Sequence, residues 1–128
     1  LLKDFQEEKG VSYLFIAHDL SMVRYVSDDV GVMYLGQLVE VCESAEIYRN
    51  PLHPYTVGLL GSIPLANPRL AREKEKSSIE GDIPSPIDPP SGCRFHTRCP
   101  FAKPICSEQA PVLKDVGGGH RVACHLHE

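Results

Sequence analysis

The stretch Val30–Cys42, with the sequence VGVMYLGQLVEVC, predicts the central element of the fold. Val30–Leu35 is rich in β-branched and apolar side chains, which favours a strand. Gly36-Gln37 follows as a turn, and Leu38–Cys42 then returns as a second strand. The stretch therefore predicts a β-hairpin, in which Cys42 is a small core residue.

Upstream of this hairpin the chain predicts two helices and a further strand. Leu1–Glu8 has the spacing of an amphipathic helix, which we expect to end at Gly10. Val11–Ala17 (VSYLFIA) is a nearly continuous apolar run, which is typical of a strand buried on both faces in a parallel sheet. Leu20–Ser27 predicts a short helix with Asp19 as its N-cap.

Downstream, Glu43–Arg49 and Pro54–Ser62 predict two more short helices. The order of elements is that of the tail of an α/β nucleotide-binding domain, so the predicted fold class is α/β. We divide the chain into an α/β part (residues 1–65), a proline-rich linker (66–92) and a small irregular four-cysteine module (93–128).

The composition excludes several classes of protein. The 128 residues carry a net charge of −4, and the 13 basic residues form no stripe, which argues against a nucleic-acid partner. No apolar run approaches the roughly 20 residues of a membrane helix, and no secretory signal is recognisable. Because the sequence begins with Leu1 rather than Met, we expect it to be a fragment of a longer protein.

Four cysteines late in the chain have the spacing C-x5-C-x6-C-x17-C: Cys93, Cys99, Cys106 and Cys124. Four thiolates suit tetrahedral zinc or a cubane iron–sulfur cluster. The spacing matches neither the paired C-x2-C zinc signatures nor the usual ferredoxin pattern. It therefore does not identify the metal, although the wide gaps between the cysteines favour a cluster. The four cysteines could also form two disulfides or remain ordinary thiols. We expect a metal site, because a segment of about 35 residues needs a staple to fold.

His18 comes directly after the predicted strand Val11–Ala17. Ligands of open α/β sheets bind beyond the carboxyl ends of the strands, where an imidazole can donate a hydrogen bond to a phosphate oxygen and orient an attacking water. His18 is therefore a candidate catalytic residue. The alternative is an ordinary loop histidine beside a helix N-terminus.

Two motifs in this first half resemble the end of ABC-transporter ATPase domains. They are LFIAHDL (Leu14–Leu20) and VGVMYLG (Val30–Gly36), the latter followed by Leu38-Val39-Glu40. The resemblance implies that His18 is the switch histidine that contacts the γ-phosphate of ATP. It also implies ATP with Mg as the cofactor of the full-length protein.

Further motifs narrow the resemblance to the ATPase subunits of oligopeptide and dipeptide importers. NPLHPYT (Asn50–Thr56) is similar to the segment that marks this group, and Gly81–Cys93 is similar to its F-type subunit. Within NPLHPYT we expect His53, Pro54 and Tyr55 to have a structural role at the start of a helix. The surroundings of the four cysteines resemble the C-terminal motif of the group, which implies a [4Fe–4S] cluster on Cys93, Cys99, Cys106 and Cys124, with zinc as the alternative.

The resemblance also implies partners and a location. These are a second ABC ATPase subunit, transmembrane permease subunits and, indirectly, an external peptide-binding protein, at the cytoplasmic face of the inner membrane. The sequence contains no Gly-x-x-x-x-Gly-Lys-Ser/Thr phosphate loop, ABC signature or Walker B motif, so we expect the 128 residues alone to be inactive. The alternative functions are a free-standing iron–sulfur redox protein and a zinc-stabilised interaction module.

Overall fold

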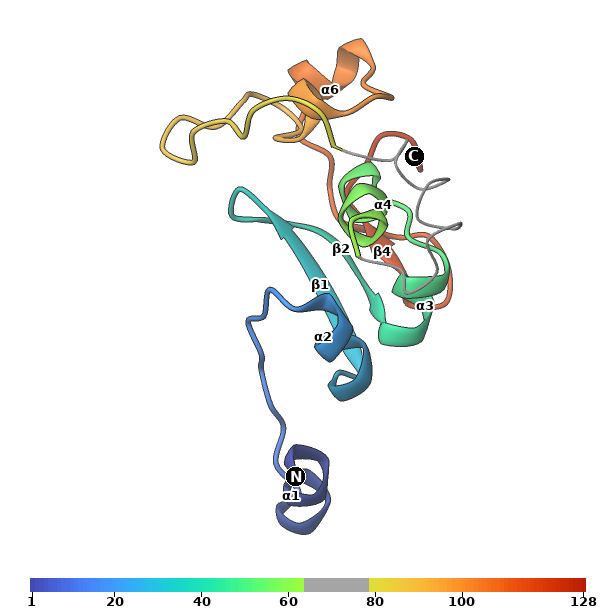
Figure 1. The fold of residues 1–128 in the computed structure, drawn as a ribbon. Helices are drawn as coiled ribbons and strands as arrows, with labels where there is room; N and C mark the ends of the chain where they lie inside the picture. The colour runs from blue at the N-terminus through green and yellow to red at the C-terminus, as the bar shows by residue number, and fades with distance from the viewer. Residues whose placement is uncertain (64–78) are drawn as a thin grey trace, which may run out of the picture.

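The structure, a computed structural model, describes residues 1–63 and 79–128 (Figure 1). The part of the predicted linker at residues 66–78 lies outside the described residues. In chain order the elements are α1 (Leu2–Lys9), α2 (Leu20–Val26), β1 (Asp29–Tyr34), β2 (Gln37–Glu43), α3 (Ser44–Arg49), α4 (Pro54–Gly61), the 3-10 turn η2 (His96–Arg98), α6 (Pro104–Glu108), β3 (Lys114–Asp115) and β4 (Arg121–Val122). Within these ranges, no helix has the length and apolar character needed to cross a membrane.

The predicted hairpin is confirmed as strands β1 and β2. The strands pair antiparallel, with Val30 opposite Cys42 and Tyr34 opposite Gln37. At the turn, Leu35 and Gly36 both have positive φ angles, 45° and 78°. Two-residue hairpin turns with this backbone match the twist of the flanking strands, and glycine adopts it without a steric cost.

The two predicted N-terminal helices are also confirmed. Helix α1 ends at Gly10, whose φ of 63° places it in the left-handed conformation typical of a helix C-cap. Helix α2 begins after Asp19, whose carboxylate accepts hydrogen bonds from the backbone N–H groups of Ser21 (2.9 Å) and Met22 (3.2 Å). These bonds satisfy two of the free donors of the first helical turn.

The predicted strand at Val11–Ala17 is wrong. These residues form no strand, and the side chains of Leu14 and Ile16 are 94% and 93% exposed. A strand needs a neighbour to complete its ladder of hydrogen bonds, and no described strand pairs with this segment. The sheet is antiparallel throughout, not parallel as the apolar run predicted.

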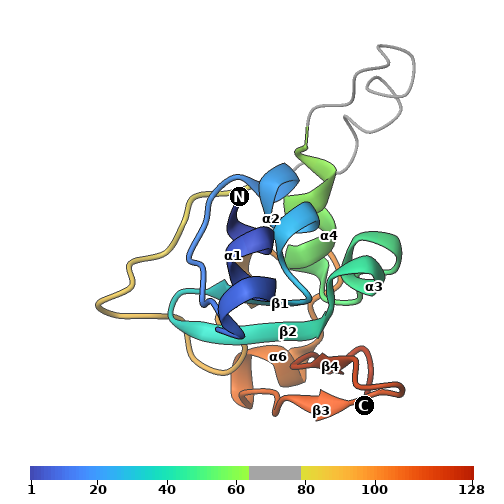
Figure 2. The same cartoon turned by 90° about the horizontal axis from the view of Figure 1, so that it is seen from below.

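The C-terminal part of the chain completes the sheet. The strand order is β1-β2-β4-β3, which Figure 2 shows from below. Strand β4 pairs with β2 through Glu40 opposite Val122, and the backbone N–H of Ala123 donates to Val39 O at 2.9 Å. The division into residues 1–65 and 93–128 stays a prediction, but these two parts share one small mixed α/β fold.

The core lies between the hairpin, helices α3 and α4, and the loop around η2. Its buried apolar side chains are Val32, Tyr34, Val39, Cys42, Ile47 and Phe95. The prediction that Cys42 is a core residue is confirmed, since its side chain is buried on β2. Burial and the nearby carboxylate of Glu40 raise the pKa of Cys42 to about 11, which keeps it a neutral thiol.

Candidate metal centre

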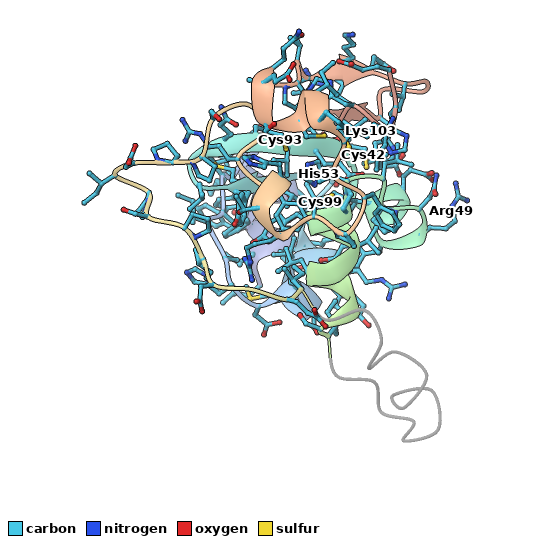
Figure 3. All side chains as sticks on the ribbon, turned by 90° about the horizontal axis from the view of Figure 1, so that it is seen from above. Cys42, Arg49, His53, Cys93, Cys99 and Lys103 are labelled. Carbon is cyan, nitrogen blue, oxygen red and sulfur yellow. The ribbon has the colours of Figure 1, made fainter. Side chains whose placement is uncertain are left out.

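One of the four predicted metal ligands lies within a short helix of the C-terminal part, and the other three lie beside short elements. Cys93 precedes η2, Cys99 follows it, Cys106 lies within α6, and Cys124 follows β4. Cys93 and Cys99 pack against the core, and Figure 3 shows them in the same region as His53. We call residues 93–124 the cysteine segment.

The thiols lie close enough together to influence one another electrostatically. The pKa of Cys124 is raised first by burial and then by the charges of the other three cysteines. The pKa of Cys93 is raised by burial and by Cys106 and Cys99. The charges of cysteines that lie up to 31 positions apart in the sequence therefore affect one another.

Backbone amides oppose this rise in three of the thiols. Hydrogen bonds from the backbones of Phe95, Phe101 and Leu126 lower the pKa of Cys93, Cys99 and Cys124 respectively, but burial outweighs them. A buried thiolate needs a compensating positive charge, and an amide hydrogen bond supplies only part of it. At neutral pH these three side chains are therefore thiols in this structure.

The approach of Cys93 to Cys106 depends on a glycine. The backbone N–H of Cys93 donates to Cys106 O at 2.7 Å, and the backbone N–H of Lys103 donates to Cys106 Sγ at 3.4 Å. Gly92 has a φ of 65°, and a Cβ atom there would lie 2.4 Å from Cys106 O and 2.8 Å from the carbonyl carbon of Ser107. Any side chain at Gly92 would push the two cysteines apart.

The arrangement differs from a site for one ion. In the described part of the chain, no group of three or more His, Cys, Asp or Glu side chains is placed to hold a metal ion. Four sulfurs around one zinc at about 2.3 Å would lie only about 3.8 Å from each other. Thiolates are nevertheless the ligands of soft and borderline metals, so the donor set fits iron or zinc.

Four histidines lie near the cysteines in the sequence, but each has a ring nitrogen bonded to other protein groups. His96 Nδ1 lies 2.8 Å from Cys93 O, and His127 Nε2 lies 3.0 Å from Leu52 O. His125 is bonded to Gln109 O (2.9 Å) and Glu128 (2.7 Å), and His120 to Glu40 (2.6 Å). These bonds give the histidines structural partners, and the cysteines remain the candidate ligands.

The buried carboxylate of Glu40 was not found from the sequence. Its side chain is 0% exposed. Oε1 accepts from the backbone N–H of Leu52 at 2.8 Å and lies 2.6 Å from His120 Nε2, and Oε2 accepts from the backbone N–H of His53 at 3.0 Å. One feature of the sequence indicates it: Glu40 is a charged residue in the middle of the apolar strand β2. A charged side chain is buried only when it has a partner.

The structural role predicted for His53 is confirmed. Its Nδ1 accepts the backbone N–H of Tyr55 at 3.0 Å, which caps α4, and Pro54 occupies the first helical position. Burial lowers the pKa of His53 to about 4, against the opposing effect of Glu40, so the ring is neutral at pH 7.

His18 lies apart from the cysteines. It is exposed and stands between the segment 11–17 and Asp19, the N-cap of α2. Figure 1 shows α2 beside β1, away from α6. The catalytic role of His18 therefore stays a prediction that depends on its motif.

Comparison with known proteins shows which family the chain resembles. The family described as "Oligopeptide/dipeptide transporter, C-terminal region" matches residues 39–106. The chain is 55% identical over 127 residues to the putative oligopeptide transport ATP-binding protein YkfD of Bacillus subtilis, and 54% identical to AppF of the same organism. It is 51% identical to OppF of Salmonella typhimurium, also an oligopeptide transport ATP-binding protein. These matches cover 99%, 99% and 97% of this chain but only 39%, 39% and 37% of the relatives.

Proposed function

This chain belongs to the family of oligopeptide/dipeptide transporter C-terminal regions, and from this membership we propose that it forms the C-terminal part of the ATP-hydrolysing subunit of a bacterial peptide ABC importer. The observation that carries the proposal is the match of residues 39–106 together with the names of the relatives. The alternative of a free-standing redox or zinc module has no such support.

In this function His18 acts on the γ-phosphate of ATP. The residue is exposed at the surface, just before the capped start of α2, and is therefore accessible to a nucleotide held by another part of the protein. Its imidazole would donate to the phosphate oxygen on which charge develops and would orient the attacking water. Such a group contributes mainly to the transition state, so it affects kcat more than nucleotide affinity.

The remaining machinery is assigned to the full-length protein. ATP with Mg binds to residues outside this chain, since the sequence contains no phosphate loop. The partners are a second ABC ATPase subunit and the transmembrane permease subunits, with an external peptide-binding protein acting indirectly. The subunit is then peripheral, at the cytoplasmic face of the inner membrane.

For the four cysteines the proposed group is a [4Fe–4S] cluster with a structural role, and zinc is the alternative. Cys93, Cys99, Cys106 and Cys124 would supply the four thiolate ligands of such a cluster. Bound iron would supply positive charge beside the half-buried side chains of Cys93, Cys99 and Cys124, which would favour their thiolate forms.

Peptide uptake tests the transport function. A strain from which the gene of the full-length protein is deleted should fail to accumulate a labelled oligopeptide, and the intact gene should restore uptake. The gene without the codons for this chain should not restore it. Undiminished uptake in the deletion strain, in the absence of other peptide importers, would contradict the proposal.

A further inference from the structure

Helix α2 begins two residues after His18 and has no buried side chain. On the other side of His18, the segment 11–17 pairs with no strand of the part of the chain that the structure describes. A helix of seven residues is too short to be stable without tertiary contacts. The position of His18 therefore depends on the contacts that hold α2 against the rest of the protein.

Helix α3 supplies these contacts. It is itself fixed in the core, since Ile47 is only 1% exposed and Ser44 only 5%. At the start of α3, the backbone N–H of Ser44 donates to Asp28 O at 2.7 Å, and the hydroxyl of Ser44 donates to Arg24 O at 3.5 Å. These bonds hold the last turn of α2 and the residues that follow it.

Tyr48, one turn further along α3, contacts the other end of α2. Its hydroxyl donates a hydrogen bond to the carbonyl of Leu20, the first residue of α2. Burial raises the pKa of Tyr48 against the opposing charge of Arg24, so the hydroxyl stays protonated and remains a donor. The guanidinium of Arg24 also lies 5.6 Å from the centroid of the Tyr48 ring, within the range of a cation–π attraction.

The first turn of α2 is therefore held on two sides. The carboxylate of Asp19 accepts two backbone N–H groups of this turn, and the hydroxyl of Tyr48 binds its first carbonyl. His18 is joined to the turn directly through the backbone of Asp19. A shift of the turn must consequently shift the imidazole as well.

From these contacts we propose that Tyr48 is a positioning residue for His18, because its hydrogen bond to Leu20 fixes the start of α2. This inference rests on the proposed catalytic role of His18. Tyr48 acts through the backbone of α2 rather than on the nucleotide itself. A displacement of about 1 Å is enough to slow a reaction that depends on exact placement, so the loss of one hydrogen bond behind His18 should be visible in kcat.

ATP hydrolysis by the full-length protein with Tyr48→Phe tests the inference. Phenylalanine keeps the ring that packs against the core and lies beneath Arg24, but it removes the hydroxyl. We expect kcat to fall about three- to tenfold while the equilibrium affinity for nucleotide changes by less than about twofold. Tyr25→Phe is the matched control: it makes the same change on α2 itself, at a side chain that is 75% exposed, and should leave kcat unchanged.

A double-mutant cycle with His18→Ala separates positioning from a general loss of stability. If Tyr48 acts through His18, adding Tyr48→Phe to His18→Ala should lower kcat by less than about 1.5-fold, because no imidazole is left to be displaced. An equally large loss from Tyr48→Phe with and without His18 would overturn the inference, since it would reflect a weakened fold.

Arg24→Met reaches the same contact from α2 and supplies the test if Tyr48→Phe does not fold. Methionine keeps a long unbranched side chain but removes the cation over the Tyr48 ring. We expect kcat to fall by about twofold or more, and only when His18 is present. If Tyr48→Phe does not fold, an unchanged kcat in Arg24→Met overturns the inference.

The outcomes also distinguish this inference from the proposed function. A wild-type rate in Tyr48→Phe, together with slow hydrolysis in His18→Ala, would overturn the role of Tyr48 and leave that of His18 standing. A wild-type rate in His18→Ala would overturn the catalytic role of His18 and the positioning role of Tyr48 with it.

Discussion

Glu40 on β2 and His120 next to β4 are 80 positions apart in the sequence, yet their side chains meet at 2.6 Å in the interior. Both side chains are buried. The carboxylate of Glu40 also accepts the backbone N–H groups of Leu52 and His53 at the start of α4. One carboxylate therefore joins the hairpin, helix α4 and the C-terminal part of the chain.

Replacing Glu40 should destabilise the fold strongly. Glu40→Ala leaves the N–H groups of Leu52 and His53 and the ring of His120 without their acceptor, at a cost of about 3–5 kcal/mol. The opening free energy from hydrogen exchange of β2 in the full-length protein measures this cost. Glu43→Ala, at the exposed end of the same strand, is the control and should cost less than about 0.5 kcal/mol. Equal effects of the two variants would refute the role of Glu40.

The stability of the fold should fall in mild acid because of His53. Burial lowers its pKa in the folded chain to about 4 from 6.5. Below pH 6.5 the unfolded chain takes up a proton that the folded chain refuses until about pH 4. The contribution is complete above pH 6.5 and decreases towards pH 4, by about 3 kcal/mol in all.

The variant His53→Asn isolates this effect. Asparagine keeps a side-chain acceptor for the N-terminus of α4 but does not titrate. The difference in opening free energy between wild type and variant should shrink as the pH falls from 6.5 to 4, and the pH dependence of the metal site cancels in that difference. A difference that stays constant over this range would show that His53 is not a buried neutral histidine.

Gly92→Ala should weaken metal binding. The new Cβ atom would lie 2.4 Å from Cys106 O, so the backbone that carries two candidate ligands must move. We expect metal affinity to fall at least about tenfold, measured by competition with a chelator. Gly118→Ala is the matched control, since Gly118 has nearly the same φ (63°) but no neighbouring atom within 4 Å of the added Cβ. Retention of wild-type affinity in Gly92→Ala would argue against the close approach of Cys93 and Cys106.

Serine at a ligand position should release the metal. Cys106→Ser replaces a thiolate with a poor donor and opens the coordination of the site. Cys42→Ser is the control, because Cys42 is buried in the core as a neutral thiol. With a cubane, anaerobically prepared wild type and Cys42→Ser should each contain about four irons per chain. One zinc and no iron per chain would show that the site binds zinc rather than a cluster. Full metal content in Cys106→Ser would show that Cys106 is not a ligand.

His18→Ala in the full-length protein should slow ATP hydrolysis by about 10²–10³-fold while nucleotide binding changes little. The reason is that the imidazole acts on charge that develops in the transition state. Steady-state hydrolysis and equilibrium nucleotide binding, measured on the same preparation, separate the two effects. A wild-type rate of ATP hydrolysis in the variant would show that His18 has no catalytic role.

Local signals in the sequence were sufficient for most of the secondary structure. Asp19 before α2, Pro54 at the start of α4, Gly10 after α1 and Gly36 in the hairpin turn act through their own backbone neighbours, and all four occur where predicted. Such capping and turn effects need no distant partner, so they can be recognised in the sequence alone.

The segment Val11–Ala17 shows where local reasoning failed. Its apolar pattern predicts a buried strand, yet a strand exists only when a neighbour completes its hydrogen bonds, and that neighbour is a property of the tertiary structure. Glu40 was missed for a related reason. A charged residue in an apolar strand does not by itself reveal which partner it has. Only the fold brings His120 beside Glu40.

The sequence by itself determined helices α1 to α4, the hairpin and the core position of Cys42, whereas it predicted neither α6 nor η2. Only the tertiary structure decided that β4 pairs with β2, that Phe95 enters the core and that Glu40 meets His120. The physical reason is distance along the chain. Caps and turns are formed by residues within a few positions of each other, whereas a sheet neighbour or a buried ion pair depends on where the whole chain has brought its partner.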